Sequence, residues 1–170
     1  LNGLQVAAAG IFAGHALFGT HVLNILPIIY GVYLYSRWTG QSFGSLTTVS
    51  LFATSAAPFI SFWAIAPGLS WWSLILAALI GTGVGFISAP LAEQYLKFHQ
   101  GFNLYNFGFA MGIIAMFGTI SFRYFKLEAP NLSILNQEHH GLLVLYLLGI
   151  LLGLFGLAVF KRTEVKANYS

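Results

Sequence analysis

The run WWSLILAALIGTGVGFISAPLA, residues 71–92, decides the fold class of this chain because it is long, apolar and free of charge. A helix needs about 20 mostly apolar residues to cross the hydrocarbon core of a bilayer. The run meets this length, and it opens with Trp71 and Trp72, whose indole rings favour the headgroup level. It therefore predicts a transmembrane helix.

Three further apolar runs have the same character, at residues 47–67, 104–122 and 142–160. Across the chain 58% of the residues are hydrophobic and only 6% are charged, whereas a soluble domain carries about 25% charged residues. This composition cannot cover a water-exposed surface. We expect an integral membrane protein embedded in the lipid bilayer, an all-α, polytopic helical bundle of about 5–6 helices.

The basic residues indicate an orientation rather than a nucleic-acid partner. Their only dense group lies in the last ten residues: Lys161, Arg162 and Lys166. A nucleic-acid binder instead gathers basic residues on one water-exposed face. Because basic segments favour the cytoplasmic side, we expect residues 1–160 to form a single transmembrane domain and residues 161–170 a cytoplasmic tail. Alternating helices then divide the other basic residues: Arg37 and Lys97 inside, Arg123 and Lys126 outside.

Several kinds of catalytic site are excluded by the sequence. It has no cysteine, which rules out disulfides, thiolate metal sites and cysteine nucleophiles. It also has no Gly-rich phosphate loop, Ser-His-Asp arrangement or HExxH motif. His139 and His140 are adjacent, so on a helix they point about 100° apart, a poor geometry for one metal. We expect no enzyme activity, no cofactor and no resident metal.

A first interruption divides the apolar stretch from Leu4 to Trp38, since one straight helix of that length would be about 52 Å long. We place the break near residues 18–28. Proline favours the first turn of a helix, so Pro27 is predicted to start a helix that runs to Arg37. Two alternatives remain open: the helix begins earlier, around Thr20, or the stretch is a re-entrant hairpin of partial helices.

A second interruption is predicted at residues 99–106, between two apolar runs. Both breaks contain Gly, four intervening residues and Asn, and both have an upstream histidine: Gly19, Asn24 and His15 in the first, Gly101, Asn106 and His99 in the second. Transporters are often built from inverted repeats with interrupted helices at matching positions. The two breaks are compatible with such a repeat, although little beyond Gly and Asn matches.

Polar side chains concentrate at the two breaks, where unsatisfied groups would cost several kcal/mol in lipid. We interpret six of them as the lining of a solute path: His15, His21, Asn24, His99, Asn103 and Asn106. The alternative is that they satisfy the broken helices' own backbone, since Asn is a good helix cap. Glu93 is spaced for an ion pair with Lys97, or it binds a proton or ion during transport.

Helix packing in lipid depends on small residues that allow backbones to approach. Glycine recurs at a spacing of four in three of the long runs: Gly81 and Gly85, Gly108 and Gly112, Gly149 and Gly153. We expect these pairs to mark helix contacts within the subunit. In the last run Gly156 extends the stripe, which makes that helix the candidate contact in a homo-oligomer.

Two stretches carry a resemblance to a known family: LNILPIIYGVYLY, residues 23–35, and GFNLYNFGFAMG, residues 101–112. They resemble an uncharacterised prokaryotic multi-pass membrane-protein family, a domain of unknown function, over residues 14–122. The resemblance implies a prokaryotic cell membrane and a full-length protein about twice as long, with an N-terminal half missing here. A weaker architectural similarity is to urea-transporter-like channels.

The leading hypothesis for function is a transporter or channel domain for a small polar solute, with a path lined by the two broken segments. Five histidines against a single acid beside an apolar run favour a neutral or anionic solute over a metal cation. The alternative, from another class, is a non-transporting membrane scaffold or assembly subunit whose Gly-rich helix faces bind partner helices.

Overall fold

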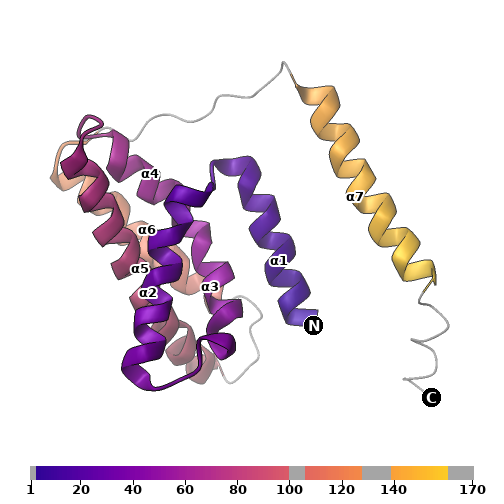
Figure 1. The fold of residues 1–170 in the computed structure, drawn as a ribbon, viewed down its shortest axis with the longest axis horizontal. Coiled ribbons are helices and arrows are strands. Elements are labelled where there is room, and N and C mark those ends of the chain that lie inside the picture. Colours follow the sequence, from indigo (N-terminus) through magenta and orange to yellow (C-terminus); the bar gives the residue numbers. More distant parts are fainter. Residues whose placement is uncertain (1–2, 100–105, 128–138, 161–170) are drawn as a thin grey trace. The chain divides into compact units, whose positions relative to one another are not determined.

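A computed structural model describes residues 3–99, 106–127 and 139–160, and every regular element in these ranges is a helix (Figure 1). The elements are α1 (Gly3–His15), η1 (Ala16–Phe18), α2 (Val22–Thr39), η2 (Phe43–Leu46), α3 (Thr47–Ala53), η3 (Thr54–Ala56), α4 (Ala57–Ile65), α5 (Trp71–His99), α6 (Asn106–Tyr124) and α7 (His140–Phe160). With α3, η3 and α4 taken as one broken helix, the described part has six helices. The all-α fold expected from the sequence is confirmed.

The chain divides into two compact units, residues 1–129 and residues 130–170. The second unit contains one described helix, α7, in which residues 140–159 are long and apolar enough to cross a membrane. The first unit contains α1 to α6. The basic tail predicted at residues 161–170 lies outside the described residues.

Within the described ranges, four segments are long and apolar enough to span a bilayer: Phe43–Ile65, Trp71–Gln94, Phe107–Tyr124 and His140–Val159. They coincide with the four apolar runs that the sequence singled out. Large apolar side chains cover the outside of the first unit, among them Leu23, Leu79 and Phe117, which are 77%, 65% and 64% exposed. Such a surface is suited to lipid tails rather than to water. The chain is an integral membrane protein.

The first break is shorter than predicted, and Pro27 does not start a helix. After η1 the chain turns at Gly19, whose φ of 87° lies in the left-handed region that favours glycine. His21 is extended, and α2 begins at Val22, with Pro27 inside it. The helix therefore begins earlier than Pro27, close to Thr20 as one open alternative expected, and α1 and α2 form a hairpin as the other alternative described (Figure 1). Asn24 caps this earlier start, because its side chain accepts a hydrogen bond from the His21 N–H at 2.9 Å.

A break that the sequence reasoning missed divides the span Phe43–Ile65. The 3-10 turn η3 separates α3 from α4, and Pro58 stands in the first turn of α4. Short 3-10 stretches within a helix often mark hinges. The turn contacts both α1 and α2. The chain reverses between α1 and α2, so these two helices form a hairpin that packs beside the interrupted helix α3–α4 (Figure 1).

Glycines bring α2 and α5 into the closest helix contact of the first unit. A β-carbon at Gly85 would overlap the carbonyl oxygen of Ile28, and one at Gly31 would overlap the carbonyl oxygen of Thr82. A β-carbon at Gly81 would lie 2.8 Å from the Cβ of Pro27. The two backbones touch along this line, and Ile28 is fully buried beside it. In lipid such van der Waals packing is a main source of helix association.

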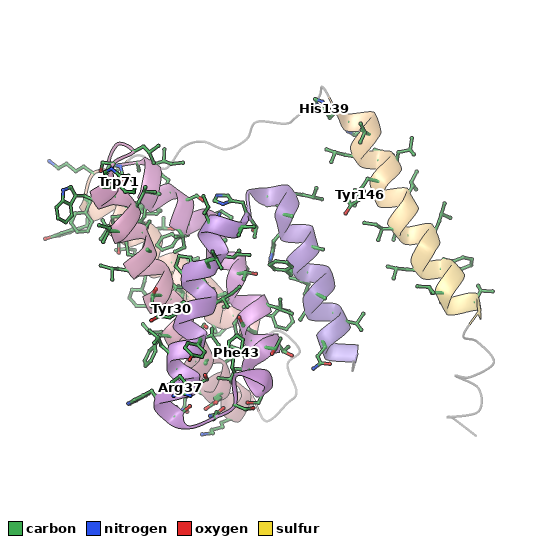
Figure 2. All side chains as sticks on the ribbon, viewed as in Figure 1. Tyr30, Arg37, Phe43, Trp71, His139 and Tyr146 are labelled. Carbon is green, nitrogen blue, oxygen red and sulfur yellow. The ribbon has the colours of Figure 1, made fainter. Side chains whose placement is uncertain are left out.

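The helices of the first unit run in two directions. Pro27 lies at Gly81 and Gln41 bonds to Glu93, so α2 and α5 are parallel. The pairs Phe52–Phe107 and Trp63–Phe125 show that α3–α4 and α6 run parallel to each other. The unit therefore has two ends. We call them the Trp71 end, where α5 begins, and the Arg37 end, where α2 finishes (Figure 2).

Candidate functional site

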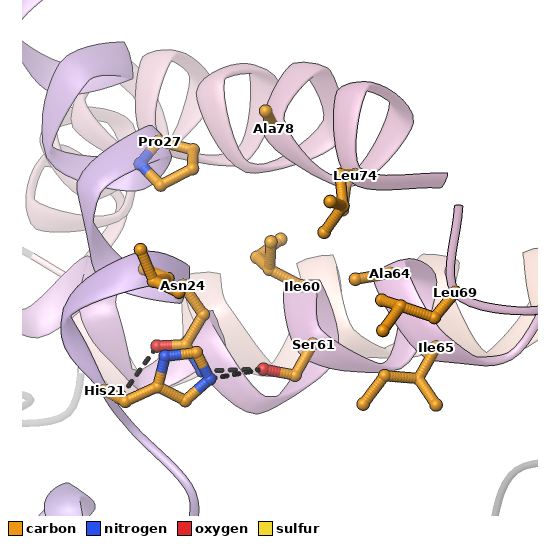
Figure 3. Close-up of a pocket in the computed structure, with 12 residues that line it drawn as sticks. His21, Asn24, Pro27, Ile60, Ser61, Ala64, Ile65, Leu69, Leu74 and Ala78 are labelled. Carbon is orange, nitrogen blue, oxygen red and sulfur yellow. Dashed lines mark hydrogen bonds between the residues drawn. The ribbon is translucent and has the colours of Figure 1, made fainter. Parts of the chain in front are cut away.

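Three polar side chains meet at the Trp71 end: His21 and Asn24 from the start of α2, and Ser61 from α4 (Figure 3). Asn24 Nδ2 donates hydrogen bonds to Ser61 Oγ at 2.8 Å and to the Gly19 carbonyl at 2.9 Å. His21 Nε2 lies 3.2 Å from the same Ser61 Oγ. These contacts tie the first break to α4, and we refer to the three residues as the polar site.

The hydrogen-bonding groups of the Asn24 side chain are all used in local interactions, and these interactions hold the polar site together. Its side chain is only 3% exposed. Both amide hydrogens are donated, to Gly19 and Ser61, and its oxygen accepts from the His21 N–H. Asn24 therefore has no free donor for a solute. Its role is to position the break and Ser61.

His21 and Ser61 are the members of the polar site that can exchange partners. Each is less buried than Asn24, and their mutual contact is on the exposed side of the site. Ser61 Oγ accepts from Asn24, so its own hydrogen can be donated to a neutral His21 nitrogen. In the other tautomer, His21 donates and the Ser61 hydrogen is free. In both arrangements the pair offers a donor and an acceptor.

A pocket of about 210 Å³ opens beside the polar site, between α2, α4 and α5. Its other walls are apolar: Leu23, Pro27, Ile60, Ala64, Ile65, Leu69, Leu74, Ala77 and Ala78. The pocket is thus an apolar cavity with one polar corner. Ligand sites commonly combine apolar walls with a few convergent polar groups.

Two further polar atoms at the first break are buried without a hydrogen-bond partner in the described part of the chain, His15 Nδ1 and Thr20 Oγ1. They flank the turn in which the Thr20 N–H bonds to the His15 carbonyl at 3.3 Å. Buried polar atoms usually have a partner, which can be an ordered water or a ligand. The break therefore has unused hydrogen-bonding capacity beside the polar site.

The second break does not reach the polar site. Leu74, near the start of α5, lines the pocket with His21, whereas His99 is the last residue of α5. The helix between them is about 38 Å long, so the two breaks lie at opposite ends of the unit. His99 and Asn106 occur at helix ends, but their side chains, and Asn103 entirely, lie outside the described residues. A single lining formed by both breaks is therefore not the arrangement observed.

Glu93 lies at the Arg37 end, far from the polar site. Its Oε1 accepts a hydrogen bond from Gln41 Nε2 at 3.4 Å. In the described part of the chain no ion pair joins Glu93 to Lys97, so the pair expected from their spacing does not form. The partner of Glu93 comes instead from the loop after α2, because α2 and α5 are parallel.

The glycine pairs differ in what they face. Gly81 and Gly85 lie against α2, whereas a β-carbon at Gly108 or Gly112 would meet no described atom within 4 Å. Gly149 and Gly153 belong to the second unit, and the helix contact expected of them stays a prediction. In α6 the close contact is instead at Gly118, where a β-carbon would overlap the ring of Phe59. Spacing alone did not separate the glycines that face a helix from those that do not.

Sequence reasoning missed Ser61, the partner that completes the polar site. A serine inside an apolar span has no distinctive pattern, because serine often bonds only to its own helix, as Ser36 does to the Tyr33 carbonyl. A signal was present nearby. Thr54, Ser55 and Pro58 interrupt the middle of the apolar run, and this interruption marks the helix that carries Ser61.

A family model described as "Protein of unknown function (DUF1576)" matches residues 1–123. The match covers α1 to α6 up to Arg123 and includes every residue of the polar site. It confirms the resemblance to a family of unknown function seen in the sequence. No curated protein and no solved structure matches the chain.

Proposed function

The chain belongs to the DUF1576 family of proteins of unknown function, and we propose that it is a transporter or channel domain for a small polar solute. The polar site is the part of the path that contacts the solute at the Trp71 end. His21 and Ser61 make the contact, and Asn24 positions them.

The observation that carries this proposal is the meeting of the turn before α2 with the interrupted helix α3–α4 at one polar corner. Many transporters bind their substrates between discontinuous helices, where the breaks free polar groups for the solute. Here the break before α2 and the helix α3–α4, itself interrupted at η3, are joined through His21, Asn24 and Ser61. The unpartnered His15 Nδ1 and Thr20 Oγ1 add hydrogen-bonding capacity at the same break.

Beyond the polar site the path is closed in this state. Ile28 and Val32 are fully buried, and α2 and α5 touch at Gly31 and Gly85. Passage therefore requires a movement of helices. We propose that α4 moves relative to the tightly packed α2–α5 pair, with η3 as the hinge.

The orientation and the division of the chain are also part of the proposal. We place the Arg37 end in the cytoplasm together with the basic tail, which puts the polar site on the outer side of a cell membrane. Residues 1–160 act as one transmembrane domain. Glu93 at the Arg37 end remains the candidate for proton or ion coupling.

Flux through the full-length protein in lipid vesicles tests the proposal. We expect vesicles that contain the protein to equilibrate urea, glycerol or acetate faster than empty vesicles, as followed by light scattering after osmotic shock. Ser61→Ala and His21→Ala are each expected to reduce the flux of the permeant solute by about two- to tenfold, the effect of one lost hydrogen bond.

The matched control is Ser121→Ala in α6, which removes a hydroxyl that donates only to the Phe117 carbonyl of its own helix, at 2.9 Å. Its flux should equal that of the unchanged protein. Flux that is the same in all four proteins would refute the polar site as a solute contact. It would favour the scaffold or assembly role, in which the face of α7 that carries Gly149 and Gly153 binds partner helices.

A further inference from the structure

A second pocket, of about 450 Å³, continues the first one along α2 and α5. Leu23, Pro27 and Ala78 line both pockets. The second pocket adds the following residues: Leu26, Tyr30, Ile75, Leu79 and Thr82. The two pockets adjoin at the three residues that line both, and we call them together the α2–α5 groove.

The α2–α5 groove has the length and the walls of a site for a hydrocarbon chain. Leu23 and Tyr30 are seven residues apart on α2, a rise of about 10 Å. The groove is open to the outside of the unit, since Leu23, Leu79 and Tyr30 are 77%, 65% and 54% exposed. Exposed apolar side chains of this kind are suited to lipid tails.

The polar end of the groove has hydrogen-bonding groups but no charge. Among the described residues, no Asp, Glu, Lys or Arg lines either pocket. A carboxylate or phosphate head would have no cation opposite it here, and burying such a charge without a partner is costly. The His21–Ser61 pair, 3.2 Å apart, offers one donor and one acceptor. A hydroxyl group is both acceptor and donor, so in either tautomer it can pair with the free donor or the free acceptor of these side chains.

We infer that the α2–α5 groove binds a neutral single-chain amphiphile, with a hydroxyl head at the His21–Ser61 pair and its alkyl chain along α2 and α5. The inference deepens the proposed function, because the same polar site contacts the solute. It adds a second class of ligand at this site, one that enters sideways from the bilayer and combines a small polar head with an apolar tail.

Photolabelling of the full-length protein in lipid nanodiscs tests this inference, since no detergent competes there. The probe is decanol that carries a diazirine in its chain. We expect saturable labelling in α2 and α5, with displacement by excess decanol and not by decanoate at neutral pH. Ala78→Phe, which fills the junction of the two pockets, should abolish the saturable labelling. Ser61→Ala should weaken apparent binding about two- to tenfold.

The control is Ala115→Phe, an equal enlargement at an exposed position of α6 that lines neither pocket. Its labelling should match that of the unchanged protein.

Unsaturable labelling, equal displacement by decanoate, or full labelling of both Ala78→Phe and Ser61→Ala would each overturn the inference and indicate ordinary lipid contact. If the labelling fails while urea or glycerol flux still depends on Ser61, the amphiphile alone is refuted. If labelling holds while flux is independent of Ser61, the transport proposal fails.

Discussion

Gly85→Ala is expected to destabilise the first unit by about 3 kcal/mol or more, whereas Gly83→Ala in the same helix leaves its stability unchanged or slightly raised. The added β-carbon at position 85 would overlap the Ile28 carbonyl, which belongs to the backbone and cannot rotate away. Overpacking a tight contact costs about 1–3 kcal/mol when side chains can adjust. At position 85 the backbones of α2 and α5 must separate, so the destabilisation lies at or above the top of this range.

Gly83 is a close control because nothing lies within 4 Å of a β-carbon built there. Alanine has a better helix propensity than glycine by about 1 kcal/mol, so Gly83→Ala isolates that gain. The measurement is the midpoint of unfolding in mixed micelles with increasing denaturing detergent. Equal midpoints for Gly85→Ala and Gly83→Ala would show that α2 and α5 do not touch as described.

Asn24→Ala is expected to lower the free energy of unfolding by about 2–4 kcal/mol. The change removes three hydrogen bonds and leaves the Gly19 carbonyl and the His21 N–H without their partner. A buried polar group left unsatisfied costs about 1–3 kcal/mol. The loss should appear in the same unfolding assay, together with faster hydrogen exchange of the amides at the start of α2.

Thr119→Ala is the control for this change, because the Thr119 hydroxyl is exposed and bonds only to the Ala115 carbonyl of its own helix. We expect an effect below about 0.5 kcal/mol there. An effect of Asn24→Ala no larger than that of Thr119→Ala would mean that Asn24 does not hold the break. Because Asn24 holds the structure of the break, a loss of flux in the Asn24→Ala variant would not by itself identify a solute contact.

The membrane-spanning segments could be predicted from the sequence because length and polarity set them directly. The run at residues 71–92 reappears as the span Trp71–Gln94, and the run at residues 47–67 as the span Phe43–Ile65. Lipid imposes one requirement on both, that about 20 apolar residues satisfy their backbone as helix. The interruption near Gly19 was also readable, since an unbroken helix there would be too long.

The arrangement of the helices could not be predicted, because it depends on contacts between segments distant in the sequence. Pro27 was expected to start α2, yet the Asn24 cap places the start five residues earlier and Pro27 packs on Gly81. The two breaks have similar sequences, which suggested that they line one shared solute path. Ser61 meets the first break instead, since α4 returns to the Trp71 end and the C-terminal end of α5 leads away from it.

The central claim is that the polar site contacts the solute, and a single introduced thiol tests it most directly. The chain has no cysteine, so Ser61→Cys gives one reactive group at the site. A membrane-impermeant methanethiosulfonate is added to vesicles that contain this variant, and the flux of urea or glycerol is measured before and after modification. The account predicts that modification abolishes most of the flux of Ser61→Cys and leaves Ala115→Cys unaffected. Unchanged flux through Ser61→Cys, once mass spectrometry shows complete modification, would contradict it.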